Sequence, residues 1–207
     1  DRLSAQAVTL AEVFHAAGYA TAAYSSVPFT GKLTNLHQGF EEVHEVTSVN
    51  LPDEYESKTA RDYVDRLSLW LERHRDGRFF VFLHVFDPHD PFEPFQPYNR
   101  LWADPAKKAE HKEQLEKVRP HIVDPILKRF GMPTREEFSA GGVDGDAYVG
   151  YDKDMYDGSI RAMDVEIERL YQRLRQLGLD RRTLLVMTSD HGEEFLEHGR
   201  TFHGQSV

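Results

Sequence analysis

Imidazole and carboxylate side chains gather near the carboxyl end of the chain, in the run SDHGEEFLEHGRTFHG (189–204). Asp190 and His191 are adjacent, and His198 and His203 follow in the same run. A carboxylate beside an imidazole can bind a divalent metal ion, because the pair combines a hard oxygen with a borderline nitrogen. A carboxylate that caps the next helix, with histidines on a solvated loop, explains the same spacing. Spacing alone therefore leaves both interpretations open.

A second set of titratable side chains occupies the proline-rich run FDPHDPFEPF (86–95), which contains Asp87, His89, Asp90 and Glu93. Proline restricts the backbone, so a stiff turn would position His89 well. Because imidazole titrates near neutral pH, His89 is a candidate hydrogen-bond donor or general acid toward a leaving-group oxygen. An ordinary X-Pro turn with an incidental histidine is the alternative.

The elements that must position these side chains follow from hydrophobic periodicity. Apolar residues at intervals of three and four predict three helices, over residues 9–17, 57–74 and 153–177. Short β-favouring or continuously apolar runs predict three strands, over residues 19–25, 79–86 and 183–189. The last two runs are typical of strands buried on both faces of a parallel sheet.

Alternation of helix and strand predicts an α/β fold, with a parallel sheet and helices on both of its faces. Such sheets carry their chemistry beyond the carboxyl ends of the strands. His89 follows the second predicted strand, and Asp190 and His191 follow the third, so all three are expected at that edge.

Proline marks a long insertion between the second strand and the third helix. Eight of the ten prolines lie between Pro88 and Pro133, and proline cannot join the interior of a sheet. We interpret residues 87–150 as a surface insertion beside the site, in which only residues 106–118 are expected to be helical. The whole chain, residues 1–207, is expected to form one domain around one core.

Composition excludes several classes of protein. The chain of 207 residues contains no cysteine, so it has neither disulfides nor a cysteine nucleophile. Its formal net charge of -10 disfavours a nucleic-acid partner. The longest apolar run, residues 79–86, is far shorter than the roughly 18 residues that a membrane span needs.

Five motifs together resemble one known family. They occur in the order TLAEVFHAAGYATAAY, QGFEE, FFVFLHVFDPHDPFEP, YDGSIRAMDVEIERLYQRLRQLGL and TLLVMTSDHGEEFLEHG. In this order they resemble the sulfatase family of the alkaline phosphatase superfamily, and they cover most of the chain outside residues 98–150. Several motifs in register are far more specific than any one of them.

The resemblance implies hydrolysis of sulfate esters by a formylglycine nucleophile, with one divalent cation as cofactor. By position, Asp190 and His191 match metal ligands of the family. His89 matches the histidine that contacts the sulfate or its leaving oxygen. His203 lies near the place where many members keep a lysine on the sulfate, which makes it a candidate substrate-binding residue. Calcium is the expected ion, but an imidazole ligand leaves manganese or zinc open.

The departures from the family concern the nucleophile. The chain contains no C/S-x-P-S-R motif, from which formylglycine is made, and no early Asp-Asp pair. In the family both precede the first predicted helix. We therefore expect these residues to be an internal fragment of the catalytic domain, incomplete at both ends, inactive alone and without the formylglycine.

Two other functions remain open at this stage. A phosphodiester or phosphonate monoester hydrolase of the same superfamily would share the Asp-His pair and the strand-end histidine. A non-catalytic metal- or carbohydrate-binding domain would retain the fold alone. The expected partner is a sulfated small molecule or carbohydrate, which the sequence does not identify further. The resemblance implies export to the periplasm or outside the cell.

Overall fold

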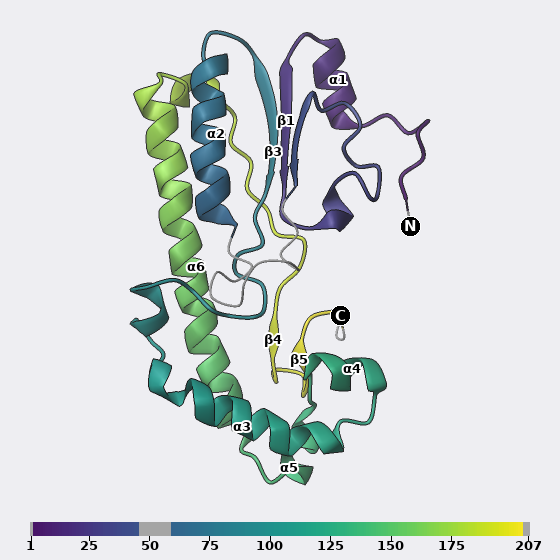
Figure 1. Cartoon of the computed structure of the whole chain (residues 1–207), viewed down its shortest axis with the longest axis vertical. Coiled ribbons are helices and arrows are strands. Elements are labelled where there is room, and N and C mark those ends of the chain that lie inside the picture. The colour runs from purple at the N-terminus through teal and green to yellow at the C-terminus, as the bar shows by residue number, and fades with distance from the viewer. Residues whose placement is uncertain (1, 46–58, 205–207) are drawn as a thin grey trace. The chain divides into compact units, whose positions relative to one another are not determined.

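The structure, a computed structural model, describes residues 2–45 and 59–204 (Figure 1). The chain divides into two compact units. The sheet unit consists of Asp1–Pro91 and Ile160–Leu184, and the hairpin unit of Phe92–Ser159 and Leu185–Val207. The first two residues of the helix predicted over 57–74 lie outside the described residues.

Three parallel strands form the sheet of the sheet unit, in the order β2-β1-β3. Their bounds are Ala20–Ser25 for β1, Glu42–Glu45 for β2 and Phe79–His84 for β3 (Figure 1). β1 and β3 pair from Ala20 opposite Phe79 to Ser25 opposite His84. The strands predicted over 19–25 and 79–86 are thereby confirmed. β2 was not predicted, because Val43 alone is apolar in its EVHE sequence.

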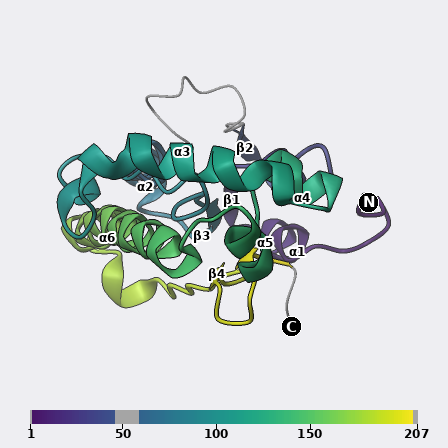
Figure 2. The same cartoon turned by 90° about the horizontal axis from the view of Figure 1, so that it is seen from below.

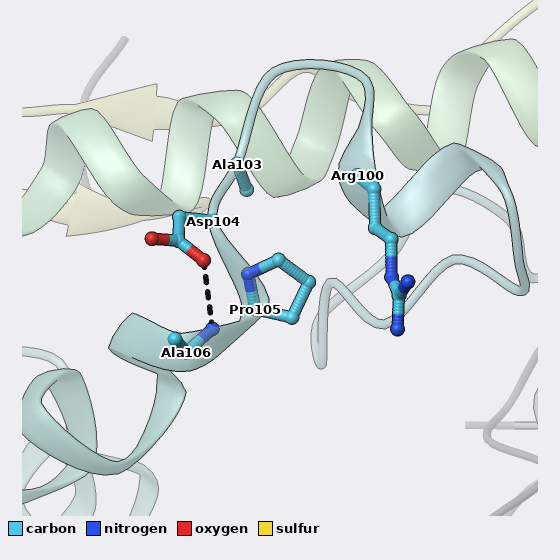
Figure 3. A pocket seen from close by; sticks show the side chains of 5 residues that line it. All are labelled: Arg100, Ala103, Asp104, Pro105 and Ala106. Atoms are coloured by element: carbon cyan, nitrogen blue, oxygen red, sulfur yellow. Dashed lines mark hydrogen bonds between the residues drawn. The ribbon is translucent and has the colours of Figure 1, made fainter.

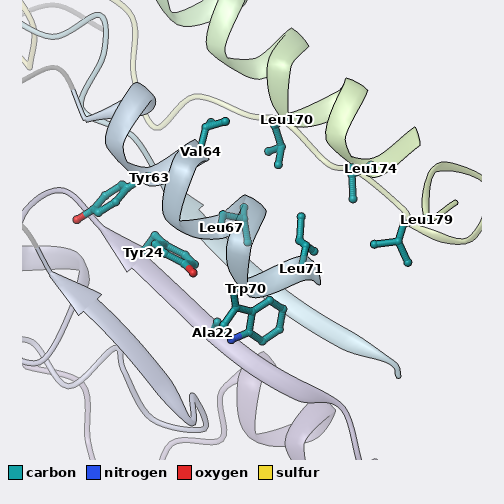
Figure 4. Packing of buried hydrophobic residues seen from close by; sticks show 10 residues of the cluster. All are labelled: Ala22, Tyr24, Tyr63, Val64, Leu67, Trp70, Leu71, Leu170, Leu174 and Leu179. Atoms are coloured by element: carbon teal, nitrogen blue, oxygen red, sulfur yellow. The ribbon is translucent and has the colours of Figure 1, made fainter. Parts of the chain in front are cut away.

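One face of the sheet is covered by α2, Ala60–His74, and by the later part of α6, Gly145–Gln176. Side chains alternate along a strand, so Ala22 and Tyr24 of β1 point to this face together. The helix periodicity predicted for α2 supplies the facing layer, with Trp70 only 1% exposed. Figure 4 shows the resulting core, which consists of Ala22, Tyr24, Tyr63, Val64, Leu67, Trp70, Leu71, Leu170, Leu174 and Leu179.

The opposite face is covered by α1, Leu10–Ala16. Phe14 of this helix stacks on Phe80 of β3, with ring centroids 4.6 Å apart and nearly parallel planes. Phe80 faces α1 because it alternates with Phe79 and Val81, which pack on the other side. The prediction of helices on both faces of a parallel sheet is therefore confirmed.

A capping box begins α1. The Thr9 hydroxyl accepts a hydrogen bond from the Glu12 backbone N–H at 3.1 Å, and the Glu12 carboxylate accepts one from the Thr9 N–H at 2.7 Å. Gly39 of the QGFEE motif passes so close that an added Cβ would lie 2.2 Å from the Glu12 nitrogen, and its φ is +88°. A side chain there would push the loop off the helix.

A buried acid joins α2 to α6. Glu166 is 2% exposed, and its two carboxylate oxygens accept hydrogen bonds from Arg61 at 2.9 Å and Arg169 at 2.7 Å. Arg169 also donates to Asp65 at 2.7 Å. A buried charge needs such pairing, because its desolvation costs several kcal/mol. Loss of one partner would leave that cost uncompensated.

The hairpin unit contains short helices, the first part of α6 and one hairpin (Figures 1 and 2). The α-helices that lie wholly in it are α3, Lys108–Val118; α4, Pro125–Phe130; and α5, Arg135–Ala140. The strands β4, Glu194–Phe195, and β5, Thr201–Phe202, pair antiparallel. The described 3-10 turns of the chain are Pro28–Thr30, Tyr98–Arg100, Pro105–Lys107, Arg119–His121 and Asp180–Arg182.

The helix predicted over 106–118 corresponds to α3, whereas α4 and α5 were not predicted. Six residues are too few to establish a hydrophobic period. Their start signals are present in the sequence, since Asp124 caps α4 and Thr134 forms a capping box with Glu137. The unit has its own hydrophobic cluster of Val118, Ile122, Phe138, Tyr148, Val149 and Leu196.

The long helix α6 begins at Gly145. The spacing of its apolar residues had predicted a later start, at Lys153. Gly158 lies within it, at a cost of roughly 1 kcal/mol against alanine. The reason is a close approach, since an added Cβ would lie 2.6 Å from the Tyr98 carbonyl oxygen. In the described part of the chain, no helix is both long and apolar enough to cross a membrane.

The strand predicted over 183–189 is wrong for this structure. These residues form no strand, and Leu184, Val186 and Met187 are 88%, 75% and 74% exposed. A strand needs a hydrogen-bonding neighbour, and the described sheet contains β2, β1 and β3 alone. β3 is also less buried than predicted, because Phe82 is 40% exposed. The apolar composition of residues 183–189 indicates a tendency to be buried, but a strand also needs a neighbouring strand to pair with.

Tyr24 makes the stability of the sheet unit sensitive to alkaline pH. Its side chain stacks on His44 and is 1% exposed. Burial, and secondarily the Glu42 carboxylate, raises the pKa of Tyr24 from 10.0 to about 12. Between these values the unfolded chain loses the proton first, so unfolding becomes more favourable as pH rises. Two pKa units correspond to about 2.7 kcal/mol as an upper limit.

We expect Tyr24→Phe to remove this part of the pH dependence. Urea unfolding of the wild type and the variant, followed from pH 9 to pH 12, measures the difference. The wild type should lose about 2 kcal/mol more than the variant over this interval. Parallel curves for the two proteins would contradict the assignment.

Candidate functional site

Asp190 and His191 lie in an irregular segment between the exposed run 183–189 and β4, and not at the tip of a strand as predicted. Their side chains are 79% and 40% exposed, so solvent reaches both. His191 Nδ1 lies 2.8 Å from the Gly192 carbonyl oxygen. A carbonyl oxygen can only accept, so Nδ1 carries the proton and Nε2 is left to act as a ligand.

The two ligand atoms of this pair fit a common ion. Asp190 Oδ2 lies 3.8 Å from His191 Nε2. Two ligands at right angles around a cation, each 2.0–2.6 Å from it, lie about 2.8–3.7 Å apart. A small side-chain rotation closes the remaining gap. Carboxylate oxygen with imidazole nitrogen suits calcium, manganese or zinc to different degrees.

His203 is brought against His191 by the fold. The two rings stack with centroids 3.9 Å apart, and a ligand atom of each ring lies within 4.8 Å of the other. His203 Nδ1 lies 3.3 Å from the carboxylate of Glu193, whose side chain is 5% exposed. The carboxylate therefore orients the His203 ring.

Glu193 was not given a role from the sequence. The only signal for it was its place in a run of acids beside two histidines, where solvated acids are common. Its pairing with His203 follows from the hairpin, in which the neighbouring residues Glu194 and Phe202 are directly opposite each other. Glu193 also acts on Tyr156, whose pKa is raised by burial first and by this carboxylate second.

The loop of the hairpin is closed from within by Glu194, which is 7% exposed. Its carboxylate accepts hydrogen bonds from the backbone N–H groups of His198 at 2.9 Å and Arg200 at 3.1 Å. Leu196 adopts a φ of +68°, which is uncommon for a residue with a side chain. It is held there because it is 3% exposed in the hydrophobic cluster.

Helices α5 and α6 fix the hairpin in place. The Arg135 backbone N–H donates to the Gly199 carbonyl at 2.9 Å, and Thr201 Oγ1 donates to the Pro133 carbonyl at 2.9 Å. Lys153 of α6 pairs with Glu197 at 2.9 Å. These attachments keep His203 opposite the segment that carries the Asp-His pair.

His89 lies in the sheet unit, in the turn that follows β3. Its backbone N–H donates to the Phe86 carbonyl at 2.8 Å, and its ring stacks on the Phe86 ring with centroids 4.3 Å apart. Its Nδ1 lies 2.7 Å from the Asp90 carbonyl oxygen. Nδ1 therefore carries a proton, and Nε2 is the atom that the turn presents for other contacts.

The predicted site residues are thus divided between the two units. Asp190, His191 and His203 belong to the hairpin unit, where His191 and His203 are in contact. His89 belongs to the sheet unit. His198 remains without a role, since its side chain is 74% exposed at the tip of the hairpin.

An open depression of about 500 Å³ lies elsewhere in the hairpin unit (Figure 3). Its lining consists of Arg100, Ala103, Asp104, Pro105 and Ala106. The Asp104 carboxylate is engaged in capping, because it accepts a hydrogen bond from the Ala106 N–H at 3.0 Å. None of the predicted site residues lines this depression.

Comparison with known proteins gives the family. The sulfatase family model matches residues 2–206. The chain belongs to the sulfatase family. A three-stranded parallel sheet between helices agrees with this α/β family, which is part of the alkaline phosphatase superfamily. No curated protein sequence matches the chain.

Two solved structures resemble this sulfatase-family chain in fold. One is a phosphonate monoester hydrolase of Agrobacterium radiobacter, with a TM-score of 0.66 and 19% sequence identity. The other is a phosphonate monoester hydrolase from Silicibacter pomeroyi, with a TM-score of 0.63 and 16% identity. Each match covers 100% of this chain and 51% of the other, so the chain spans about half the length of either enzyme.

The geometry of His191 predicts its tautomer in the metal-free protein. In the neutral imidazole we expect the proton on Nδ1 and a lone pair on Nε2. Long-range ¹H–¹⁵N NMR of the full-length protein with labelled histidine measures this, and His191→Gln identifies the signal by its loss. A proton on Nε2 would remove that nitrogen from the set of candidate ligands.

Proposed function

We propose that the complete protein hydrolyses sulfate esters, with one divalent cation bound by Asp190 and His191. Membership of the sulfatase family over residues 2–206 supports this function. The observation that carries it is the Asp-His geometry, in which Oδ2 and Nε2 are 3.8 Å apart while Nδ1 is committed to a carbonyl.

The cation would be held by Asp190 and His191. When bound, it supplies positive charge that stabilises oxygens gaining negative charge during ester cleavage. Calcium is the first candidate, and manganese or zinc are the alternatives because one ligand is an imidazole.

His89 is proposed to act on the departing alcohol. Because Nδ1 donates to the Asp90 carbonyl, Nε2 is the atom of the ring that would transfer the proton. The protonated ring can donate from Nε2 to the leaving oxygen, and the neutral ring can only accept there. Donation matters most for alcohols that leave poorly.

His203 is proposed to contact the anionic group of the substrate. Glu193 lies 3.3 Å from Nδ1, so Nε2 of the protonated ring can donate to a sulfate oxygen. An imidazole would replace the lysine that many relatives of the family keep near this position. The substrate class remains a sulfated small molecule or carbohydrate.

Phosphonate monoester hydrolysis is the second candidate. The similarity in fold to two phosphonate monoester hydrolases favours it, and both reactions need a divalent cation and a proton donor for the leaving oxygen. At 19% and 16% identity the likeness concerns the fold alone. The two esters differ in charge and in the central atom, so a direct comparison of rates separates them.

We expect the full-length protein to prefer 4-nitrophenyl sulfate over the 4-nitrophenyl ester of phenylphosphonate by about tenfold or more in kcat/KM. His89→Ala should lower kcat on sulfate esters by about 10²–10⁴-fold, as is usual for loss of a general acid. Release of nitrophenolate measures both quantities.

The matched control is His15→Gln, at a histidine of the sheet unit whose side chain is 53% exposed. It should leave both rates unchanged. A preference for the phosphonate ester would move the assignment to the second candidate. Metal binding without hydrolysis of either ester would favour a non-catalytic domain.

Asp190→Ala should weaken the binding of divalent metal by about a hundredfold or more, since loss of outer partners of a ligand alone costs 10–100-fold. Isothermal titration of the metal-free full-length protein with Ca²⁺ and Mn²⁺ measures the affinity. Asp76→Ala, at an acid whose side chain is 94% exposed, is the control for loss of one negative charge. Equal affinities for wild type and Asp190→Ala would refute the metal assignment.

A further inference from the structure

Asp87 lies two residues before His89 and is buried, with 6% of its surface exposed. One oxygen of its carboxylate, Oδ2, accepts hydrogen bonds from the backbone N–H groups of Thr59 at 2.9 Å and Ala60 at 3.0 Å. These groups begin α2. The first N–H groups of a helix have no partner within it and attract negative charge. The anion at this helix end is thus supplied by the turn that carries His89.

A chain of hydroxyl groups makes a second attachment nearby. The Phe86 N–H donates to Thr59 Oγ1 at 2.8 Å, and Thr59 Oγ1 is 2.6 Å from Ser26 Oγ. Ser26 Oγ donates to the His84 carbonyl at 2.5 Å. Since a carbonyl can only accept, the Ser26 hydroxyl proton points to His84, and the Thr59 hydroxyl proton points to Ser26. Every hydroxyl in the chain both donates and accepts.

Together these bonds hold the last residue of β3 and the segment that follows it. The groups that are bound are the His84 carbonyl, the Phe86 N–H and the Asp87 carboxylate. The turn continues from them, because the Phe86 carbonyl accepts from the His89 N–H and the Phe86 ring stacks on the His89 ring. The attachment of residues 84–87 to Ser26 and to the start of α2 therefore determines the direction in which the His89 imidazole points.

We propose that Asp87 is a positioning residue for His89. Its carboxylate fixes the segment to the start of α2 and thereby fixes the direction in which His89 Nε2 points. The inference rests on the proposed function, in which His89 donates a proton to the leaving oxygen. A displacement of about 1 Å at a reacting group can cost about 10²-fold in rate, so loss of the attachment should be felt in kcat.

Asp87→Ala is the variant that removes the attachment, and Asp87→Asn keeps one carbonyl oxygen that can accept from the same N–H groups. Asp124→Ala is the control, because the exposed carboxylate of Asp124 also accepts from N–H groups at a helix start, with hydrogen bonds of 2.7 Å from Ile126 and 3.1 Å from Leu127 of α4. Both alanine variants remove a carboxylate from a helix start. Asp87 alone is joined to the His89 turn.

Kinetics on aryl sulfates with good and poor leaving groups test the inference in the full-length protein. Asp87→Ala should lower kcat by about tenfold on 4-nitrophenyl sulfate and by about a hundredfold on phenyl sulfate, with KM little changed. Asp87→Asn should recover most of the loss, and Asp124→Ala should not change the dependence on leaving group. In the His89→Ala background, Asp87→Ala should have little further effect, because the two residues act on one step.

Equal losses on both esters, or full additivity with His89→Ala, would overturn the positioning role. If the wild type cleaves none of these esters, the proposed function fails, and NMR tests the inference without activity. The ¹H–¹⁵N signals of the His89 ring should then shift in Asp87→Ala and not in Asp124→Ala. Unchanged signals would overturn the inference. Should Asp87→Ala fail to fold, Asp87→Ser, which removes the carboxylate and keeps a polar side chain beside the start of α2, replaces it in the same measurements.

Discussion

Parallel pairing of β1 with β2 and β3 is the constraint from which the arrangement of the sheet unit follows. Because all three strands run in one direction, their carboxyl ends lie at one edge, and the connections must cross back over the faces. α1 and α2 are placed on opposite faces by this requirement. The same requirement sets Ser26, Thr59 and Asp87 side by side, although they are far apart in the sequence.

That edge buries polar groups, and the fold satisfies them without using solvent. The hydroxyls of Ser26 and Thr59 and the carboxylate of Asp87 meet backbone groups that would otherwise be costly to bury. The positive end of α2 is thereby neutralised from within the chain. This helix end differs from the phosphate-binding helix ends of many α/β proteins, because its first N–H groups already bond to a carboxylate.

Much of this fold can be predicted from the sequence, because α1, α2, β1 and β3 each carry a period or a capping signal long enough to recognise. β2, α4 and α5 are too short to show one. The prediction of a strand over 183–189 is wrong for another reason. Its apolar residues require a neighbouring strand that the described sheet does not contain. Local patterns predict what a segment can form, and pairing partners decide what it does form.

The residues of the candidate site likewise fall into those that could be predicted from the sequence and those that could not. Asp190 and His191 could be found because they are adjacent, and His89 because prolines surround it. The contact between His191 and His203 could not, since it depends on a hairpin of two-residue strands closed by a buried Glu194. The task of Asp87 could not be predicted either, because its partner Thr59 is 28 residues earlier. Buried acids in acidic chains resemble solvated ones until their partners are known.

An exposed apolar run favours aggregation of the polypeptide. It consists of Leu184, Leu185, Val186 and Met187. Extended, apolar and free of proline and charge, it has the composition of segments that pair between molecules. Wherever it lacks a neighbouring strand, two copies can supply one to each other, and aggregation competes with folding. Charged substitutions within these four residues would therefore improve solubility without touching the Asp-His pair that follows.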